Sequence, residues 1–469
     1  MFRAIFTNSF GILFSRVLGF VRDLMTASIL GANVYSDIFF IAFKLPNLFR
    51  RIFAEGAFTQ TFLPAFTRSR HKAVFSVHIF LVFFGFILLM TVAVNLFPAA
   101  AAKLIALGFD AETVRLAAPY VAINFFYLPL IFAVTFLSTF LQYKNHFATT
   151  AFATGLLNIT LIVALWLAQG RADETVVLYL SVGVVAGGTA QLLLHLLAVR
   201  RLRLHRLLLG GVRYYRRKLP AVREETRRFT REFFPAVWGN STAQFAAFLD
   251  TWLASFLGAG VISYLYYANR VFQLPLALFA IATSVALFPK VSRHLKHGDE
   301  AKARRMLSKA FTFLLYLLGL SSVGGIVLSH EITWLLFQRG AFTAEDTANT
   351  AFILKMYLIG LLPFGLGKLF SLWLYAQRRQ AEAARIATWS LGSNILFSLA
   401  LIYPLGGAGL ALSTTISGFV TLAATLRAVG REHLSDIIRF KEIAVWTAAM
   451  AVFAIVLVLL KVSFGLVLG

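Results

Sequence analysis

Residues 74–98 read VFSVHIFLVFFGFILLMTVAVNLFP and contain no Asp, Glu, Lys or Arg. A helix needs about 20 apolar residues to cross the hydrocarbon core of a bilayer, so this stretch predicts a transmembrane helix. The whole chain has a similar character: 59% of its 469 residues are hydrophobic and 14% are charged, against about 25% charged residues in soluble domains. The sequence therefore predicts an all-α polytopic membrane protein and excludes a soluble or disordered one.

Apolar segments of spanning length lie on both sides of this stretch. The first lies at residues 1–19, and we interpret it as a retained span rather than a cleaved signal peptide because Arg16 interrupts its apolar run. The others lie at residues 33–66, 114–141, 147–168, 174–199, 229–257, 262–291, 307–329, 347–377, 384–404, 407–427 and 441–466. With residues 74–98, these segments predict about thirteen transmembrane helices.

A basic stretch at residues 200–228 is the longest segment between the predicted spans. It predicts four parts of the chain: a six-helix lobe at 1–199, a cytoplasmic linker at 200–228, a second six-helix lobe at 229–429, and one extra helix within 430–469. A Leu-Pro pair recurs in the second helix of each lobe, at Leu45-Pro46 and Leu274-Pro275. Parallel repeats of this kind are typical of transporters, so we expect two lobes around a central cavity.

The charge of the chain is strongly positive. Lys and Arg number 44 against 20 Asp and Glu, a formal net charge of +24. The excess lies in the loops after the second, fourth, sixth, eighth, tenth and twelfth predicted helices. Basic loops stay in the cytoplasm, so the pattern predicts a cytoplasmic N-terminus and, with thirteen helices, a C-terminus on the opposite side. Orientation explains the charge, and no nucleic-acid partner is expected.

Catalytic motifs are missing from the sequence. The chain has no cysteine, which excludes disulfides, thiolate nucleophiles and Cys-based metal sites. None of its nine histidines forms a His-Glu-x-x-His motif, and no Gly-rich loop ends in Gly-Lys-Ser or Gly-Lys-Thr. We therefore expect no catalytic residues, no cofactor and no ATP-driven pumping by this chain.

Charged side chains inside the predicted spans are the strongest indication of function. Each costs about 2.5–3.5 kcal/mol to insert and normally faces a protein interior or a water-filled cavity. Those in the first, second and eighth predicted helices are Arg16, Arg22, Asp23, Asp37, Lys44, Arg50, Arg51, Glu55 and Arg270. Arginine outnumbers the acids here, and its planar guanidinium binds phosphate bidentately. The sequence predicts a cationic cavity for a phosphate or diphosphate; alternatively, Arg22 pairs with Asp37 and Arg50 with Glu55, or the side chains reach the head groups.

A sparser polar group lies in the seventh, eleventh and twelfth predicted helices, at Asp250, Asn394, Ser398 and Thr414. One carboxylate with amide and hydroxyl oxygens suits a small hard cation such as Na⁺, and Asp250 alone suits a proton relay. An aspartate hydrogen-bonded between helices fits the sequence at least as well. Coupling to Na⁺, coupling to H⁺ and transport driven by the membrane potential alone remain alternatives, and no other metal is expected.

Several motifs are shared with one known family. They are FSRVLGFVRD at residues 14–23, SDIFFIAFKLPNLFRRIFAEGAF at residues 36–58, YYANR at residues 266–270 and LFQRGAF at residues 336–342. Through them, and over nearly its whole length, the chain resembles the MurJ (MviN) family of bacterial lipid II flippases. Many members have fourteen helices, so the thirteen predicted here imply one C-terminal helix in place of two.

The resemblance implies a fold, a substrate and a set of residues. The fold is that of the multidrug/oligosaccharidyl-lipid/polysaccharide exporter superfamily, and the substrate is lipid II, the undecaprenyl-diphosphate disaccharide-pentapeptide. Such a protein would move lipid II from the cytoplasmic to the periplasmic leaflet of the bacterial inner membrane by alternating access, with its C-terminus in the periplasm. The residues implied in substrate binding are Arg16, Arg22, Asp37, Arg50, Glu55, Ser263 and Arg270. A sodium site would fall near Asp250, Asn394 and Thr414, although Ser398 stands where the family has a carboxylate.

Other functions compatible with the sequence differ in what they demand of the arginines. A flippase for another polyprenyl-diphosphate saccharide would need the same charges, whereas a drug or cation exporter of the superfamily should have an acidic cavity. A membrane scaffold should tolerate their replacement by alanine. We expect lipid II or a related lipid as the ligand, membrane lipids as neighbours, and a chain that functions as a monomer.

Overall fold

The computed structural model of the chain describes residues 2–50, 58–438 and 440–468, without the side chains of residues 2–9, 12, 238–243, 247, 431, 440 and 464–468. Nearly all of the described backbone is helical, and no strand occurs in it. Nine helical segments of the described ranges are long and apolar enough to cross a membrane. The prediction of an all-α polytopic membrane protein is therefore confirmed.

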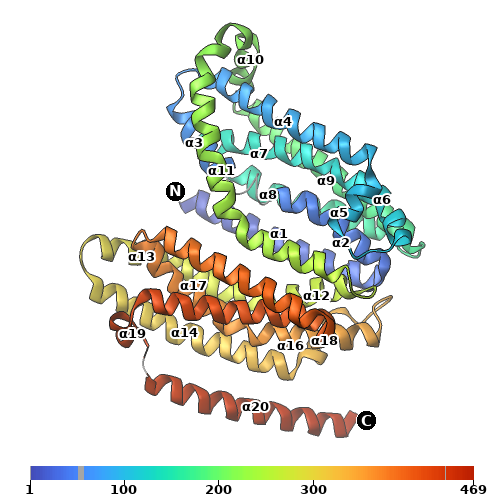
Figure 1. Cartoon of the computed structure of the whole chain (residues 1–469), viewed down its shortest axis with the longest axis vertical. Coiled ribbons are helices and arrows are strands. Elements are labelled where there is room, and N and C mark those ends of the chain that lie inside the picture. Colours follow the sequence, from blue (N-terminus) through green and yellow to red (C-terminus); the bar gives the residue numbers. More distant parts are fainter. Residues whose placement is uncertain (1, 51–57, 439, 469) are drawn as a thin grey trace. The chain divides into compact units, whose positions relative to one another are not determined.

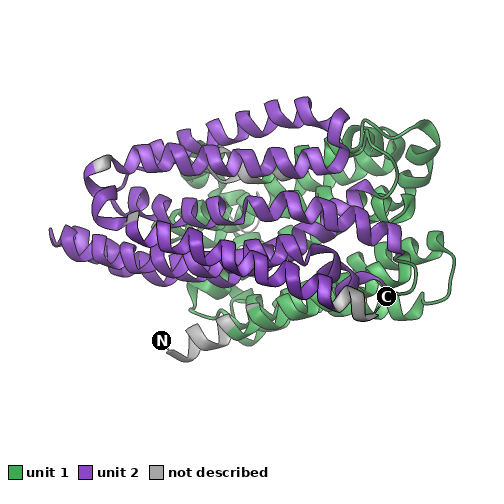
Figure 2. Cartoon of the chain, turned by 90° about the horizontal axis from the view of Figure 1, so that it is seen from below, with its two compact units in different colours: residues 1–260, 339–342 green, residues 261–338, 343–469 purple. Residues whose placement is uncertain are grey.

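The chain divides into two compact units, residues 1–260 with 339–342 and residues 261–338 with 343–469 (Figure 2). The helices of unit 1 are α1 (Phe2–Leu30), α2 (Val34–Phe49), α3 (Thr59–Arg68), α4 (Lys72–Leu96), α5 (Pro98–Ile105), α6 (Ala111–Phe125), α7 (Tyr127–Tyr143), α8 (Ala148–Leu167), α9 (Asp173–Arg201), α10 (His205–Arg213) and α11 (Tyr215–Ala254). Figure 1 labels most of these helices on the ribbon.

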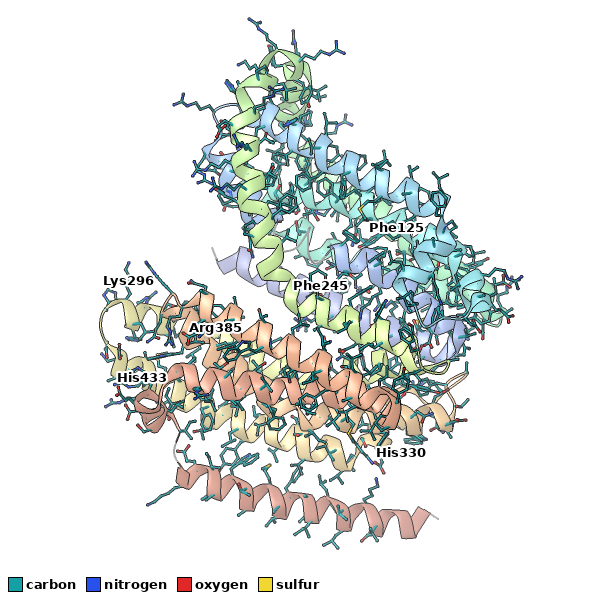
Figure 3. The ribbon with its side chains drawn as sticks, viewed as in Figure 1. Phe125, Phe245, Lys296, His330, Arg385 and His433 are labelled. Carbon is teal, nitrogen blue, oxygen red and sulfur yellow. The ribbon has the colours of Figure 1, made fainter. Side chains whose placement is uncertain are left out.

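Unit 2 contains the remaining helices. They are α12 (Val261–Pro275), the π-helix η2 (Leu276–Ile281), α13 (Ala282–Lys296), α14 (Glu300–Val327), α15 (Ser329–Phe337), α16 (Ala344–Ile359), α17 (Leu361–Ala376), α18 (Gln380–Val429), α19 (Arg431–Ile437) and α20 (Phe440–Leu468). In Figure 3, Lys296, Arg385 and His433 lie toward one end of this unit, and His330 lies toward the other.

The predicted spans correspond in order to single helices or to helices in series. The stretch at 74–98 is α4 and the start of α5, and the span at 262–291 is α12, η2 and α13. The second span, 33–66, is α2 and α3, and residues 51–57 between them lie outside the described residues.

The basic stretch predicted as a linker, 200–228, is helical in the structure. It comprises the end of α9, then α10 and the first part of α11, and α11 continues without interruption to Ala254. By its contacts α11 belongs to unit 1, whereas the sequence assigned residues from 229 onward to the second lobe. The predicted boundary at residue 229 therefore falls inside α11. A change from basic to apolar residues does not by itself end a helix.

One helix is too long for a single crossing. The 50 residues of α18 would extend about 75 Å at 1.5 Å per residue. Gly406 breaks it with φ 56° and ψ −134°, and a Cβ on Gly409 would lie 2.1 Å from the carbonyl oxygen of Leu401. The backbone therefore turns back on itself there, which yields the two separate spans predicted at 384–404 and 407–427.

A cluster of phenylalanine rings holds unit 1 together. Phe62 of α3 stacks on Phe75 of α4 at 5.8 Å between centroids and meets Phe229 of α11 edge-on at 6.2 Å. Phe140 of α7 adds a further edge contact with Phe62 at 6.0 Å. Aromatic pairs of this kind contribute about 0.5–1.5 kcal/mol beyond the burial of their area. The cluster fixes α3 and α11 against the helices of the first unit.

The last helix, α20, belongs to unit 2 and packs along α14. The indole of Trp446 lies against Gly319 of α14, where a Cβ would be 2.6 Å from Nε1, and Glu442 accepts a hydrogen bond of 2.6 Å from Thr312. Further along α20, Lys461 forms an ion pair of 2.8 Å with Glu331 of α15. Both side chains of this pair are more than two-fifths exposed.

The Glu331–Lys461 pair predicts a small pH-dependent stabilisation. Partial burial raises the pKa of Glu331, but the hydrogen bond and charge of Lys461 outweigh it, so the pKa lies below its ordinary value. The stabilisation is therefore present above the ordinary pKa of about 4.5 and lost as pH falls through the lowered value. We expect Glu331→Gln to destabilise unit 2 by about 0.2–1 kcal/mol at pH 7. Thermal unfolding in detergent should show the difference from wild type disappearing as the pH falls through the lowered pKa of Glu331; a difference that grows at low pH would contradict it.

Candidate functional site

Helix α1 positions the first two candidate arginines by its close approach to α8. A Cβ on Gly11 would lie 2.8 Å from the Cβ of Ala151, and one on Gly155 would lie 3.3 Å from the ring of Phe14. Glycines at these positions let the two backbones come together. The face of α1 that carries Gly11, Ser15, Gly19 and Arg22 is consequently directed at α8.

Arg22 is held in this α1–α8 contact and is only 8% exposed. Its Nη2 lies 2.6 Å from Oδ1 of Asp23, and its Nη1 donates a hydrogen bond of 3.0 Å to Oδ1 of Asn158. The amide of Asn158 in turn donates to the carbonyl of Ser15 at 2.9 Å. The guanidinium is thus paired with an acid, its neighbour Asp23.

Arg16 lies on a different part of α1 and is exposed. In the part of the chain that the structure describes, its side chain forms no ion pair or hydrogen bond. It lies six residues from Arg22, about 9 Å along the helix axis. Its guanidinium donors are therefore not used by the other described residues.

Helix α2 carries two more candidates at its opposite ends. Asp37, 2% exposed, lies in the first turn, and its Oδ2 accepts a hydrogen bond of 2.7 Å from the N–H of Gly260. At the other end, Nε and Nη2 of Arg50 both donate to Oδ1 of Asn47, at 3.0 and 2.8 Å. Glu55 lies outside the described residues.

The candidates of unit 2 lie on α12, two turns apart. Ser263 is fully buried, and Arg270 is half-buried. The guanidinium carbon of Arg270 lies 5.0 Å from the ring centroid of Tyr266, and Nη2 donates a hydrogen bond of 2.8 Å to the tyrosine hydroxyl. A guanidinium supported in this way is restricted in its rotamers before any ligand binds.

The residues considered for a cation fall into both units. Asp250 is on α11 in unit 1, whereas Asn394 and Thr414 are on α18 in unit 2. The turn at Gly406 brings the latter two together, with Nδ2 of Asn394 donating to Oγ1 of Thr414 at 3.2 Å. Ser398 bonds Ser413 at 2.7 Å beside them. Among the described residues, no group of three or more His, Asp or Glu residues could hold a metal ion.

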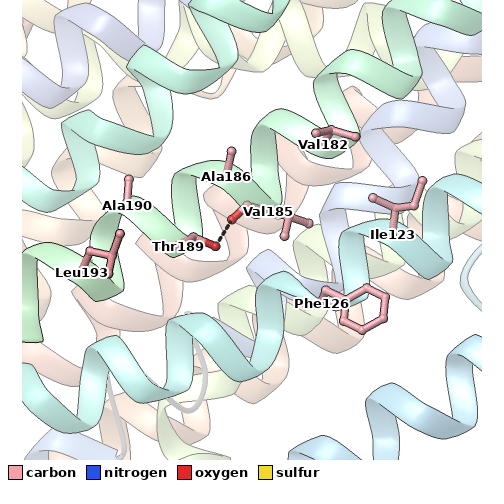
Figure 4. Close-up of a pocket in the computed structure, with 8 residues that line it drawn as sticks. All are labelled: Ile123, Phe126, Val182, Val185, Ala186, Thr189, Ala190 and Leu193. Carbon is pink, nitrogen blue, oxygen red and sulfur yellow. Dashed lines mark hydrogen bonds between the residues drawn. The ribbon is translucent and has the colours of Figure 1, made fainter.

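An apolar cavity of about 540 Å³ lies between α6 and α9 in unit 1 (Figure 4). Phe126 and Val182 are among the residues that line it, and the one hydroxyl in its lining, Thr189, donates to the carbonyl of Val185 at 3.0 Å. Such a lining suits a hydrocarbon chain and not the anionic group for which arginines are suited.

Several partners of the candidate arginines were not among the predicted site residues. Tyr266 precedes Arg270 by four residues and Asn47 precedes Arg50 by three, which are the spacings at which helical side chains meet. That spacing was a usable signal in the sequence. Asn158 is 136 residues from Arg22, and no local pattern could have paired them.

Comparisons with known proteins agree on the relatives of this chain. A family model described as "Lipid II flippase MurJ" matches residues 26–468. The probable lipid II flippase MurJ of Helicobacter pylori strain J99 is 49% identical over 421 residues, which cover 88% of this chain and 92% of that protein. The probable lipid II flippase MurJ of Buchnera aphidicola is 30% identical over 461 residues, 96% of this chain and 88% of that protein.

Two solved structures show the same fold. A lipid II flippase MurJ in an inward closed conformation aligns with a TM-score of 0.78 at 24% identity, over 97% of this chain and 98% of that one. An inward-facing multidrug resistance transporter of the MATE family, from the MOP superfamily, aligns with a TM-score of 0.66 at 13% identity, over 92% of this chain and 98% of that one. The chain therefore shares its fold with these two structures.

Proposed function

Because the chain belongs to the MurJ family of lipid II flippases, we propose that Arg16, Arg50 and Arg270 bind the diphosphate of lipid II while the chain moves it across the bacterial inner membrane. The family makes this chain a transporter and not an enzyme. It is a multi-pass membrane protein, and a single chain supplies all the residues of the proposed site.

The observation that carries the proposal is the exposed guanidinium of Arg16, which has no ion-pair partner in the described ranges. A diphosphate lipid must exchange its hydration for donors of comparable strength. Arginine supplies them in a planar fork and sheds water more readily than lysine. Arg16 is therefore the residue most available to replace water around the phosphate oxygens.

Arg270 and Arg50 complete the proposed site, and their guanidinium groups are pre-organised before the ligand binds. The ring of Tyr266 supports one guanidinium and the amide of Asn47 supports the other. Less rotamer entropy is lost when such side chains bind a ligand. Asp37 and Ser263, both buried, would position α2 and α12 around the head group, and Glu55 is included from the family resemblance.

Arg22 has a different role in this proposal. It forms an ion pair with Asp23, and its Nη1 donates a hydrogen bond to Asn158 of α8. We infer that it positions α1, and with it Arg16, instead of binding the diphosphate directly.

The proposed cycle is alternating access. The head group enters from the cytoplasmic side, the arginines bind the diphosphate, and the lobes reopen toward the periplasm while the lipid tail stays in the bilayer. A potential that is negative inside favours expulsion of an anion by about 2.3 kcal/mol per charge per 100 mV, and the proposed cycle takes this potential as its driving force. Coupling to Na⁺ or H⁺ through Asp250, Asn394 and Thr414 is the alternative.

The orientation in this proposal has a cytoplasmic N-terminus and a periplasmic C-terminus. The cationic residues at one end of unit 2, Lys296 and Arg385 among them (Figure 3), support it, since basic segments stay in the cytoplasm.

The test is a cell depleted of its own lipid II flippase and supplied with this chain. We expect the wild-type chain to restore the amount of lipid-linked precursor that a membrane-impermeant reagent can label from outside. The Arg270→Ala variant, inserted at the same level, should label far less precursor. Equal labelling by both would support the scaffold alternative and reject the proposal.

A further inference from the structure

A cationic cavity of about 330 Å³ lies in unit 1, between the turn that joins α3 to α4 and the helix α10. Figure 1 shows α10 at one end of this unit. The lining of the cavity includes four side chains that stay charged at neutral pH, namely Arg70, Lys72, Arg206 and Lys218. His71 and the hydroxyl-bearing Tyr214 complete the polar part of the wall. None of these residues belongs to the arginine set proposed to bind the transported lipid.

The positive charge of this cavity is not neutralised within the described part of the chain. None of the four cations forms an ion pair with a carboxylate there. The carboxylate of Glu225 is engaged with the turn itself: it accepts hydrogen bonds from Ser69 Oγ at 2.6 Å and from the N–H of Arg70 at 3.2 Å. Lys72 lies over the rings of Phe66 and Tyr143 at 5.8 and 5.6 Å, which orders its ammonium.

Helix α10 contributes Arg206, Leu207 and Gly210 to the cavity and carries exposed apolar side chains outside its lining. Gly211 brings α10 onto α4, since a Cβ there would lie 2.3 Å from the carbonyl oxygen of Ala73. On the outer side, Leu209 is 64% exposed and Val212 is 63% exposed. A short helix with basic and exposed apolar residues is typical of segments that lie in the membrane interface.

These observations decide what kind of anion the cavity fits. A soluble anion such as inorganic phosphate would bind the cations alone and would make no favourable contact with the exposed side chains of Leu209 and Val212. A phospholipid uses both, because its phosphate meets the cations while its acyl chains follow the apolar side chains. The basic stretch at 200–228 supplies Arg206, Lys218 and the apolar residues alike.

We propose that this cavity binds the phosphate head group of an anionic phospholipid, separately from the site for the transported lipid. The head group receives charge-assisted hydrogen bonds from the four cations, and α10 is held in the interface. The site thereby fixes the connection between α9 and α11, the helices on either side of α10.

The test uses the full chain in detergent and phosphatidylglycerol as the probe, with binding measured by native mass spectrometry. We expect preferential binding of phosphatidylglycerol over phosphatidylcholine. Arg206→Glu and Lys218→Glu should each weaken it about ten-fold or more, as expected for loss of a charge-assisted hydrogen bond. Arg217→Glu is the matched control, because Arg217 is exposed beside Lys218 but does not line the cavity; it should leave the preference unchanged.

A neutral variant separates the cavity from general surface charge. A side chain on Gly210 would meet no atom within 4 Å, so Gly210→Leu should fold and fill the cavity while keeping every charge. We expect it to weaken phosphatidylglycerol binding to a similar degree. Unchanged binding in Gly210→Leu, or equal losses in Arg217→Glu and Lys218→Glu, would overturn the site. Full competition by inorganic phosphate would overturn the assignment to a lipid.

Discussion

Replacing Arg16 by Ala is expected to abolish most lipid II flipping while leaving unit 1 folded. The side chain is exposed and, in the described ranges, makes no hydrogen bond or ion pair, so its removal takes nothing from the packing of α1 on α8. The change does remove a guanidinium that binds phosphate. Charge-assisted hydrogen bonds are worth about 1.5–3 kcal/mol, which corresponds to a loss of roughly 10- to 100-fold.

The measurement is outward exposure of labelled lipid II in proteoliposomes that contain the purified chain. Arg16→Lys keeps the charge but loses the fork, and we expect intermediate activity from it. Arg171→Ala is the control, because Arg171 is an exposed arginine in the turn between α8 and α9. If Arg16→Ala matched wild type at equal reconstitution, the binding role of α1 would have to be abandoned.

The membrane fold could be predicted because one physical requirement acts on every span. Each crossing needs about 20 apolar residues whatever lies beside it, so residues 74–98 were identifiable without knowledge of their neighbours. The structure places α4 there. The same length requirement predicts two spans within α18, because its 50 residues are more than one crossing of the membrane needs.

The partners of the charged residues could not be predicted in the same way. Arg22 lies beside Asn158 because glycines on α1 and α8 allow the two helices to touch. The close contact between α1 and α8 depends on the surfaces of both helices. No periodic pattern in the sequence near Arg22 indicates it. The charge of Arg22 was visible in the sequence, but its neutralisation by Asp23 within a helix contact was not.

The unit boundary illustrates the same limit. The basic composition of residues 200–228 predicted a linker that ends before residue 229. In the structure, Phe229 and Phe233 of α11 pack among rings of α3 and α4, so the whole of α11 belongs to unit 1. Asp250, further along α11, therefore belongs to a different unit from Asn394, and sequence spacing contains no information on such a division.

The largest effect on stability is expected from Asp23→Ala. This change leaves the guanidinium of Arg22, 8% exposed, without its ion-pair partner at Asp23, and breaking one side of a buried pair costs about 3–5 kcal/mol. Titration of the purified chain with a denaturing detergent should show a matching loss. Glu112→Ala removes an exposed acid in the first turn of α6 and is the control, with little change expected.

A double variant then decides what Arg22 does. In Arg22→Met/Asp23→Ala both charges are gone, and an apolar side chain fills the space beside Asn158. Replacing a whole buried pair by apolar residues is often nearly neutral, so most of the stability lost in Asp23→Ala should return. If Arg22 only positions α1, flipping should return with it. A stable double variant that cannot flip lipid II would instead place Arg22 among the residues that bind the diphosphate, because the fold would be intact and only the charge missing.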